Sequence, residues 1–162
     1  MKSINLILFS IAFFSFLDYG IAQSKKKADK ETAIWRYELE PAGTGIQGSY
    51  QIKVWSYSKK AETAIEQAKK NAVHGIIFKG FPSKERLSGQ KALAQNPNLE
   101  EVKSEFFKEF FQDGGKYLKF VTLVNNGAIA SEDRIKIGKE YKIGVIVSVN
   151  VAALRKDLED AG

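Results

Sequence analysis

Residues 141–151, YKIGVIVSVNV, alternate more regularly than any other part of this chain. Such a period of two is typical of a β-strand with one buried face, because successive side chains of a strand point to opposite sides. One side carries only large residues: Tyr141, Ile143, Val145, Val147, Val149 and Val151. The other side carries Gly144, Ile146 and Ser148, so we expect another part of the protein to pack closely over it.

Immediately before this strand, the chain is rich in further strand signals. We predict a strand over 117–124, a turn over 125–127 and a less regular strand over 128–137. Gly138-Lys139 fits a two-residue hairpin turn into the strand at 141–151. After the strand, Asn150 is expected to cap a short helix whose inward residues are Val151, Leu154 and Leu158.

The first half of the chain predicts two more strands and an alanine-rich helix. A strand is expected from Thr32 to Glu40, ended by Pro41, and a second from Ser49 to Ser58. Ser58 is expected to cap a helix over 59–73, whose alanines recur at helical spacing. His74-Gly75 would close this helix, and Ile76 to Phe78 would form a short buried strand.

Residues 81–95 show no period, and we expect a long surface loop there. Asn96-Pro97 is a strong helix start, with Glu100 and Glu101 in the first turn. This second helix would end at Gly114-Gly115 and has a face rich in phenylalanine.

These elements predict an α+β fold. We expect a mainly antiparallel sheet of about six strands, two main helices packed on one face, and a short C-terminal helix.

The N-terminus predicts export. Lys2 precedes a short apolar run over 4–17, and Gly20-Ile21-Ala22 has the small residues of a signal peptidase site. We therefore expect a signal peptide at 1–22, a flexible tether at 23–31 and a single domain at 32–162. An uncleaved membrane anchor is the alternative, although the run is short for a spanning helix. The expected location is the periplasm or the periphery of the outer membrane, since Gln23 resembles the mature start of many exported proteins of the Bacteroidota.

The chain has no cysteine and a formal net charge of +6. Without cysteine it can form neither a lipid-modified N-terminus nor a disulfide or thiolate site. The excess of positive charge would favour anionic lipid or glycan as partners. The lysines are dispersed rather than gathered in a dense block, so we do not expect nucleic acid as a partner.

Few residues are candidates for catalysis. Gly43 to Gly48 match the pattern G-x-G-x-x-G, but a strand and not a helix follows, so we expect a hairpin connection and no dinucleotide. His74 is the only histidine, and we interpret it as a structural residue at a helix end. Glu132-Asp133 with Arg134 is interpreted as a turn or an edge ion pair. We expect no enzyme activity, no metal site and no cofactor.

Several aromatic and basic residues are candidates for an interaction surface. Trp55 and Tyr57 share a strand face with Lys53 and would stack on a ligand if that face is exposed. The alternative is that these rings pack in the core or in a subunit interface. The loop at 81–95 adds two basic candidates, Lys84 and Arg86. In the second helix Phe107 and Phe111 widen the apolar face, which is either fully buried or contacts a partner.

The alanine-rich segment from Ala61 to Ala72, with a strand expected at 75–79, resembles small exported bacterial domains of the FlgT N-terminal type. This resemblance covers about a fifth of the chain, and it implies an accessory part of an envelope assembly without assigning any functional residue. We therefore expect a non-catalytic subunit of a cell-envelope complex, in contact with other envelope proteins or with a second copy of itself. The alternative is a periplasmic module that binds carbohydrate or lipid.

Overall fold

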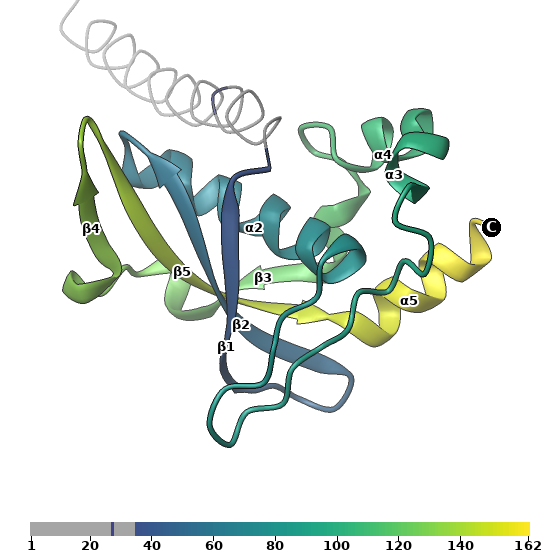
Figure 1. Ribbon diagram of the computed structural model, residues 1–162, viewed down its shortest axis with the longest axis horizontal. Coiled ribbons are helices and arrows are strands. Elements are labelled where there is room, and N and C mark those ends of the chain that lie inside the picture. Colours follow the sequence, from purple (N-terminus) through teal and green to yellow (C-terminus); the bar gives the residue numbers. More distant parts are fainter. Residues whose placement is uncertain (1–26, 28–34) are drawn as a thin grey trace, which may run out of the picture.

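The structure is a computed structural model that describes Lys27 and residues 35–162. The predicted signal peptide at 1–22, the rest of the tether at 23–31 and residues 32–34 lie outside the described residues. The described part has an α+β fold in which one sheet and one long helix form two layers (Figure 1).

The sheet has five strands and is antiparallel throughout, in the order β1-β2-β5-β3, with β4 also paired to β5. It has one strand fewer than the sequence predicts. The bounds are β1 Tyr37–Thr44, β2 Ser49–Ser58, β3 Val121–Leu123, β4 Arg134–Ile137 and β5 Glu140–Asn150.

Strand β5 lies at the centre of the sheet, as its alternating pattern favours. It pairs with β2 along one edge, while β4 and β3 share its other edge, one beside each half of the strand. The large side chains predicted to share one side are buried here, and Ile143, Val145, Val147 and Val149 have no exposed surface. Burying aliphatic side chains contributes about 1.5–3 kcal/mol each, which makes this strand the main source of sheet stability.

Helix α2 (Ala61–Phe78) crosses one face of the sheet, which we call the covered face. Ile52 and Val54 of β2 lie beneath it, fully buried. The helix runs through His74 and Gly75 to Phe78, so the strand predicted for Ile76 to Phe78 is wrong. Gly75 is needed inside the helix because a Cβ there would lie 2.2 Å from Leu39 Cδ1. The predicted cap is also different: Lys60 is the N-cap, and Ser58 Oγ accepts a hydrogen bond from the Lys60 amide.

The phenylalanine-rich segment forms two short helices where one was predicted. They are α3 (Leu99–Val102) and α4 (Ser104–Phe110), and the chain bends between them at Lys103, whose φ of −108° and ψ of 37° are not helical. Residues 81–95 contain no helix or strand, as predicted, although the bridges Phe81–Gln90 and Lys84–Leu87 fold them back as a hairpin.

The segment before β5 is less regular than predicted. A strand was predicted over 117–124. Its first residues belong instead to the 3-10 turn η1 (Lys116–Phe120), and only the three residues of β3 are extended. The predicted turn at 125–127 is present within η2 (Val124–Gly127), where Asn125 and Asn126 have positive φ. The strand predicted over 128–137 shrinks to β4, preceded by η3 (Ser131–Asp133).

Pro41 lies inside the edge strand β1. At one edge β1 continues past Pro41 to Thr44 with a register shift after Pro41, so the proline does not end the strand as predicted. An edge strand tolerates proline because the amides on its outer side need no partner in the sheet.

The last helix follows β5 directly. Asn150 caps α5 (Val151–Asp160) as predicted, and its side chain accepts a hydrogen bond from the Ala153 amide.

Candidate functional site

The face of the sheet opposite α2 is covered by no α-helix of residues 35–162, although the short 3-10 helix η3 reaches it through Asp133, and we call it the open face. Strand alternation places residues of β1, β2 and β5 on it, among them Glu38, Glu40, Lys53, Trp55, Tyr57, Lys142, Gly144, Ile146 and Ser148. Three of the residues predicted for interaction, Lys53, Trp55 and Tyr57, therefore lie together here.

Trp55 lies at the centre of the open face. It is opposite Gly144 in the strand register, and a Cβ on Gly144 would be 3.0 Å from the indole ring. This is the close packing that the small residues of β5 predicted. The indole Nε1 donates to Glu40 Oε1 at 2.6 Å, and the ammonium groups of Lys53 and Lys142 lie 5.5 and 5.2 Å from the ring centroid. The ring is thus fixed by polar contacts on its edge and its face.

Tyr57 is fixed in a similar way. The Arg36 guanidinium lies 4.2 Å from the ring centroid, and the hydroxyl donates to Glu38 Oε1 at 3.1 Å. Glu38 also accepts from Lys142 at 2.7 Å, and mainly this hydrogen bond lowers the pKa of the Glu38 carboxyl. Both aromatic rings therefore already have cationic partners from the protein itself.

Glu40 joins the loop at 81–95 to the open face. It accepts from Lys84 Nζ at 2.6 Å, and mainly this contact lowers the pKa of the Glu40 carboxyl. Lys84 thus joins the predicted residues of β2, whereas Arg86 is exposed near the tip of the loop. The buried Asp133 of η3 accepts from Lys53 at 2.7 Å, so the predicted ion pair of this acidic cluster with Arg134 is replaced by a pair with Lys53.

Between this loop and the sheet there is a hollow of about 260 Å³. It is lined by Glu40, Pro41, Ala42, Lys53, Lys84, Glu85, Leu87 and Ile146. The open face is therefore not flat, and it offers space for about one side chain of a partner.

Phe107 and Phe111 lie in the core, with 5% and 7% of their surface exposed. Phe107 packs edge-on against Phe78 of α2 with a centroid distance of 4.9 Å, and Phe111 lies 5.4 Å from Trp35. Of the two alternatives that the sequence leaves open, the structure has the buried one. These two side chains are not part of a surface.

A second cluster surrounds His74. Trp35 stacks on its ring at 3.5 Å, the Tyr37 hydroxyl lies 2.5 Å from Nδ1, and Glu100 Oε2 lies 3.1 Å from Nε2. With Glu100 ionised, Nε2–H donates to the carboxylate and Nδ1 accepts from Tyr37. Trp35 holds this place with a φ of 48°, an outlier for a bulky residue.

The electrostatics of this cluster do not favour proton transfer at neutral pH. Burial lowers the pKa of His74 to about 3, with a smaller effect from Lys79. Burial also raises the pKa of the Tyr37 hydroxyl, so that it stays protonated. A general base works best with a pKa near the working pH. The interpretation of His74 as a structural residue is therefore the better supported one.

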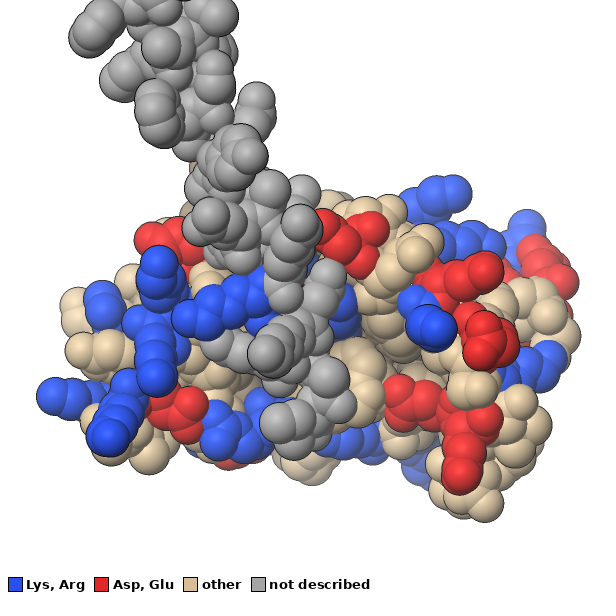
Figure 2. Space-filling view, turned by 90° about the horizontal axis from the view of Figure 1, so that it is seen from above, with Lys and Arg blue, Asp and Glu red and all other residues tan. Residues whose placement is uncertain are grey.

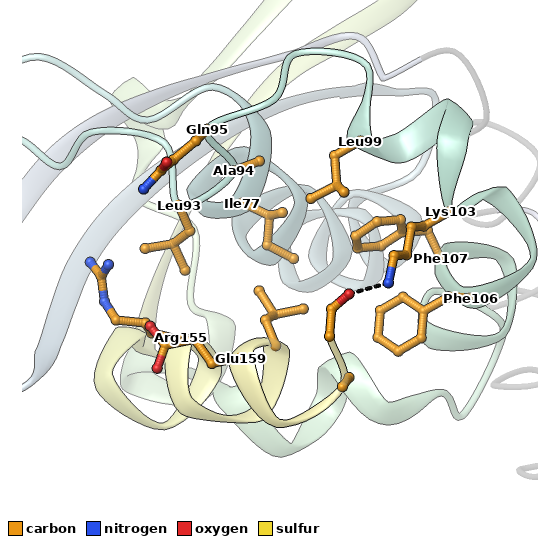
Figure 3. Close-up of a pocket in the computed structure, with 13 residues that line it drawn as sticks. Ile77, Leu93, Ala94, Gln95, Leu99, Lys103, Phe106, Phe107, Arg155 and Glu159 are labelled. Carbon is orange, nitrogen blue, oxygen red and sulfur yellow. Dashed lines mark hydrogen bonds between the residues drawn. The ribbon is translucent and has the colours of Figure 1, made fainter.

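A pocket of about 260 Å³ lies at the other end of the molecule, between α2, the segment 93–95, α3, α4 and α5 (Figure 3). Side chains of Ile77, Leu93, Leu99, Phe106 and Phe107 point toward its centre. No sequence signal predicted this pocket, because its walls come from segments that are distant in sequence.

Two kinds of feature are absent from the described part of the chain. Residues 35–162 contain no helix long and apolar enough to cross a membrane. The same residues contain no group of three or more histidine, aspartate or glutamate side chains placed to hold a metal ion.

Comparison with known proteins found no match. No family model matches the chain, and neither the curated proteins nor the solved structures gave a match.

Proposed function

We propose that this chain is a non-catalytic accessory subunit of a bacterial cell-envelope complex, and that it docks onto its partner through the open face. The observation that carries the proposal is the open face itself: a sheet surface over which residues 35–162 place no α-helix, and on which rings and charges are already held in place. Preorganised side chains lower the entropic cost of binding a partner.

Exposed aliphatic residues extend the open face onto β4. Ile135 lies opposite Lys142 and Ile137 opposite Glu140, so both isoleucines point to the same side as Lys142. They are 46% and 43% exposed. Aromatic and aliphatic side chains surrounded by paired charges are typical of a protein interface with an apolar centre and a polar rim.

The weak support for catalysis at His74 also favours a binding role. Export and residence in the envelope remain proposals that rest on the sequence of residues 1–22. The resemblance to domains of the FlgT N-terminal type supports the proposal only through the alanine-rich helix, because residues 75–78 are helical and the expected strand does not follow.

The proposal is tested by photo-crosslinking in the bacterium that makes the protein. A photoreactive amino acid replaces Ile135 in the full chain, and a matched control carries it at Ile46, which is 86% exposed at the turn between β1 and β2. We expect one envelope protein to be crosslinked in high yield from position 135 and not from position 46. The double variant Ile135→Asp, Ile137→Asp should release the chain from that protein, whereas Ile46→Asp should not.

The proposal is overturned if light scattering of the native extract shows a strictly monomeric, unattached chain. A crosslink pattern that is the same from positions 46 and 135 would also contradict it.

Carbohydrate or lipid binding at the open face is the alternative. Lys and Arg side chains gather at the end of the molecule where β4 lies (Figure 2). Arg134 and Lys136 of β4 are exposed, but they lie opposite Ile143 and Tyr141 and therefore point away from the open face. This charge supports contact with an anionic lipid or glycan at the end of the sheet and not on the open face itself. Stacking of a sugar on Trp55 or Tyr57 is less well supported, because lysine or arginine groups already lie near both rings. Glycan or lipid binding that is unchanged in Trp55→Ala would remove ring stacking as a support for this alternative.

A further inference from the structure

The pocket between α2 and α5 has a wall that is suited to an apolar chain. It is built by Ile77, Leu93, Leu99, Phe106, Phe107 and Leu158. Ile77 and Phe107 are buried in the core, whereas Leu99, Phe106 and Leu158 are half-buried. The side chains of Leu99 and Phe106 point into the pocket (Figure 3). Main-chain hydrogen bonds from Leu93 and Ala94 to Ile76 and Ile77 fix the segment that closes one side.

The rim of the pocket carries positive charge. Lys103, just before α4, lines the pocket on one side, and Arg155 of α5 lines it on another. Glu159 is the only acidic side chain among the lining residues. Lys103 Nζ donates to the main-chain oxygen of Gly162, drawn as a dashed line in Figure 3. The Lys103 ammonium at the mouth of the pocket therefore already binds an oxygen atom. An oxygen of a ligand head group would take the place of the Gly162 oxygen.

The size of the pocket limits the ligand. Its volume of about 260 Å³ exceeds the roughly 150 Å³ of a cavity that holds benzene and is just below the about 300 Å³ at which pockets for drug-sized ligands begin. A single unbranched chain of about eight to ten carbons has a suitable size for this volume, whereas a whole lipid with two acyl chains is too large.

From this wall, rim and size we propose that the pocket binds a single-chain amphiphile with an anionic head, such as a medium-chain carboxylate. The chain lies against Leu99, Phe106 and Leu158, and the carboxylate accepts a charge-assisted hydrogen bond from Lys103. Arg155 lies on the opposite side of the pocket and adds only longer-range positive charge (Figure 3). This site is separate from the open face, and it does not depend on the proposed docking function.

Titration calorimetry with decanoate, below its micelle concentration, tests the proposal on the full mature chain. We expect saturable binding of one decanoate per chain. Decyltrimethylammonium, which has the same chain and a cationic head, should bind at least roughly tenfold more weakly, because Lys103 and Arg155 would repel it.

Two pairs of variants test the wall and the rim separately. Leu99→Trp fills the pocket and should abolish binding, whereas Val102→Trp on the same helix, at a position 70% exposed and outside the lining, should leave it unchanged. Lys103→Gln should weaken binding roughly tenfold, and Lys108→Gln, an exposed lysine of α4 outside the pocket, should not. Circular dichroism of each variant confirms that it is folded.

A vesicle experiment distinguishes the two sources of such a chain. Vesicles of phosphatidylglycerol that bind the protein and are displaced by decanoate would assign the pocket to one acyl chain of a bilayer lipid. Failure to bind them, together with decanoate binding, would assign it to a free carboxylate.

The proposal is overturned if decanoate does not bind, if the cationic analogue binds equally well, or if Leu99→Trp and Val102→Trp behave alike. All three outcomes leave the docking proposal untouched, because that proposal is tested at Ile135 and Ile137.

Discussion

The two faces of the same sheet are held in different ways. On the covered face, aliphatic side chains such as Ile52 and Val147 are fully buried under α2, and Tyr37 and His74 are buried beside them. On the open face, Trp55 and Tyr57 lie among Glu38, Glu40 and lysine side chains that remain partly exposed. Burial of apolar area keeps its strength in salt, whereas exposed ion pairs are screened. The covered face therefore determines the stability of the sheet, and residues of the open face can differ with little effect on stability.

The largest effect is expected from a truncation on the covered face. Ile52→Ala removes fully buried methyl and methylene groups and should lower the free energy of unfolding by about 2–5 kcal/mol, through lost burial and a residual cavity. Ile146→Ala, a half-buried position of the open face, should cost less than about 1 kcal/mol. Urea denaturation of both variants measures the difference. Equal losses would show that the two faces contribute alike.

An intermediate effect is expected from acid at His74. Its folded-state pKa of about 3 lies below the ordinary 6.5, so the unfolded chain binds a proton first as the pH falls. Stability from this group is complete above pH 6.5 and is lost progressively between pH 6.5 and 3. The loss at pH 5 should be about 2 kcal/mol.

Thermal unfolding of the wild type and of His74→Gln at pH 7 and pH 5 checks this effect. The variant should be less stable at pH 7, since Tyr37 and Glu100 lose their partner, but it should lose less between pH 7 and 5. Burial raises the pKa of Glu100, which acts in the opposite direction just above pH 4.5, so the comparison ends at pH 5. A wild type and variant with the same pH dependence would contradict the prediction.

The smallest effect is expected on the open face. Glu38→Gln removes the ion pair with Lys142 and should cost about 0.2–1 kcal/mol at low ionic strength, and almost nothing in about 1 M salt. The pKa of Glu38 is lowered, so its contribution is present above the ordinary pKa of 4.5 and is lost as the pH falls through the folded-state pKa. Glu132→Gln, an exposed residue of η3, is the matched control. A cost that persists in high salt would show that the network is shielded from solvent.

The sequence was sufficient to predict the helices and strands whose apolar residues recur with a clear period. It was insufficient where several buried apolar residues follow one another directly. Strand β2 and the faces of β5 are where alternation predicted them, because each has one buried side. Ile76 to Phe78 were predicted as a strand because a short apolar run has no distinguishing period. In the structure this end of α2 contacts other elements on several sides, so buried residues occur all around the helix.

The open face could be predicted in part. Alternation along β2 was enough to place Lys53, Trp55 and Tyr57 together. The contact of Lys84 with Glu40 could not be predicted, since it joins residues 44 positions apart through a loop without a period. The pocket at α5 depends on how α3 and α4 bend at Lys103, which no local pattern in the chain indicated.

The position of β5 has a consequence for the order of folding. Of the five strands it is the last in the chain, yet β2, β3 and β4 all pair with it and not with one another. The sheet therefore cannot be completed until residues 140–150 have been made, and its contacts close long loops, which slows folding. A chain built in this way cannot close its sheet before residues 140–150 are present, which would suit the export that we propose.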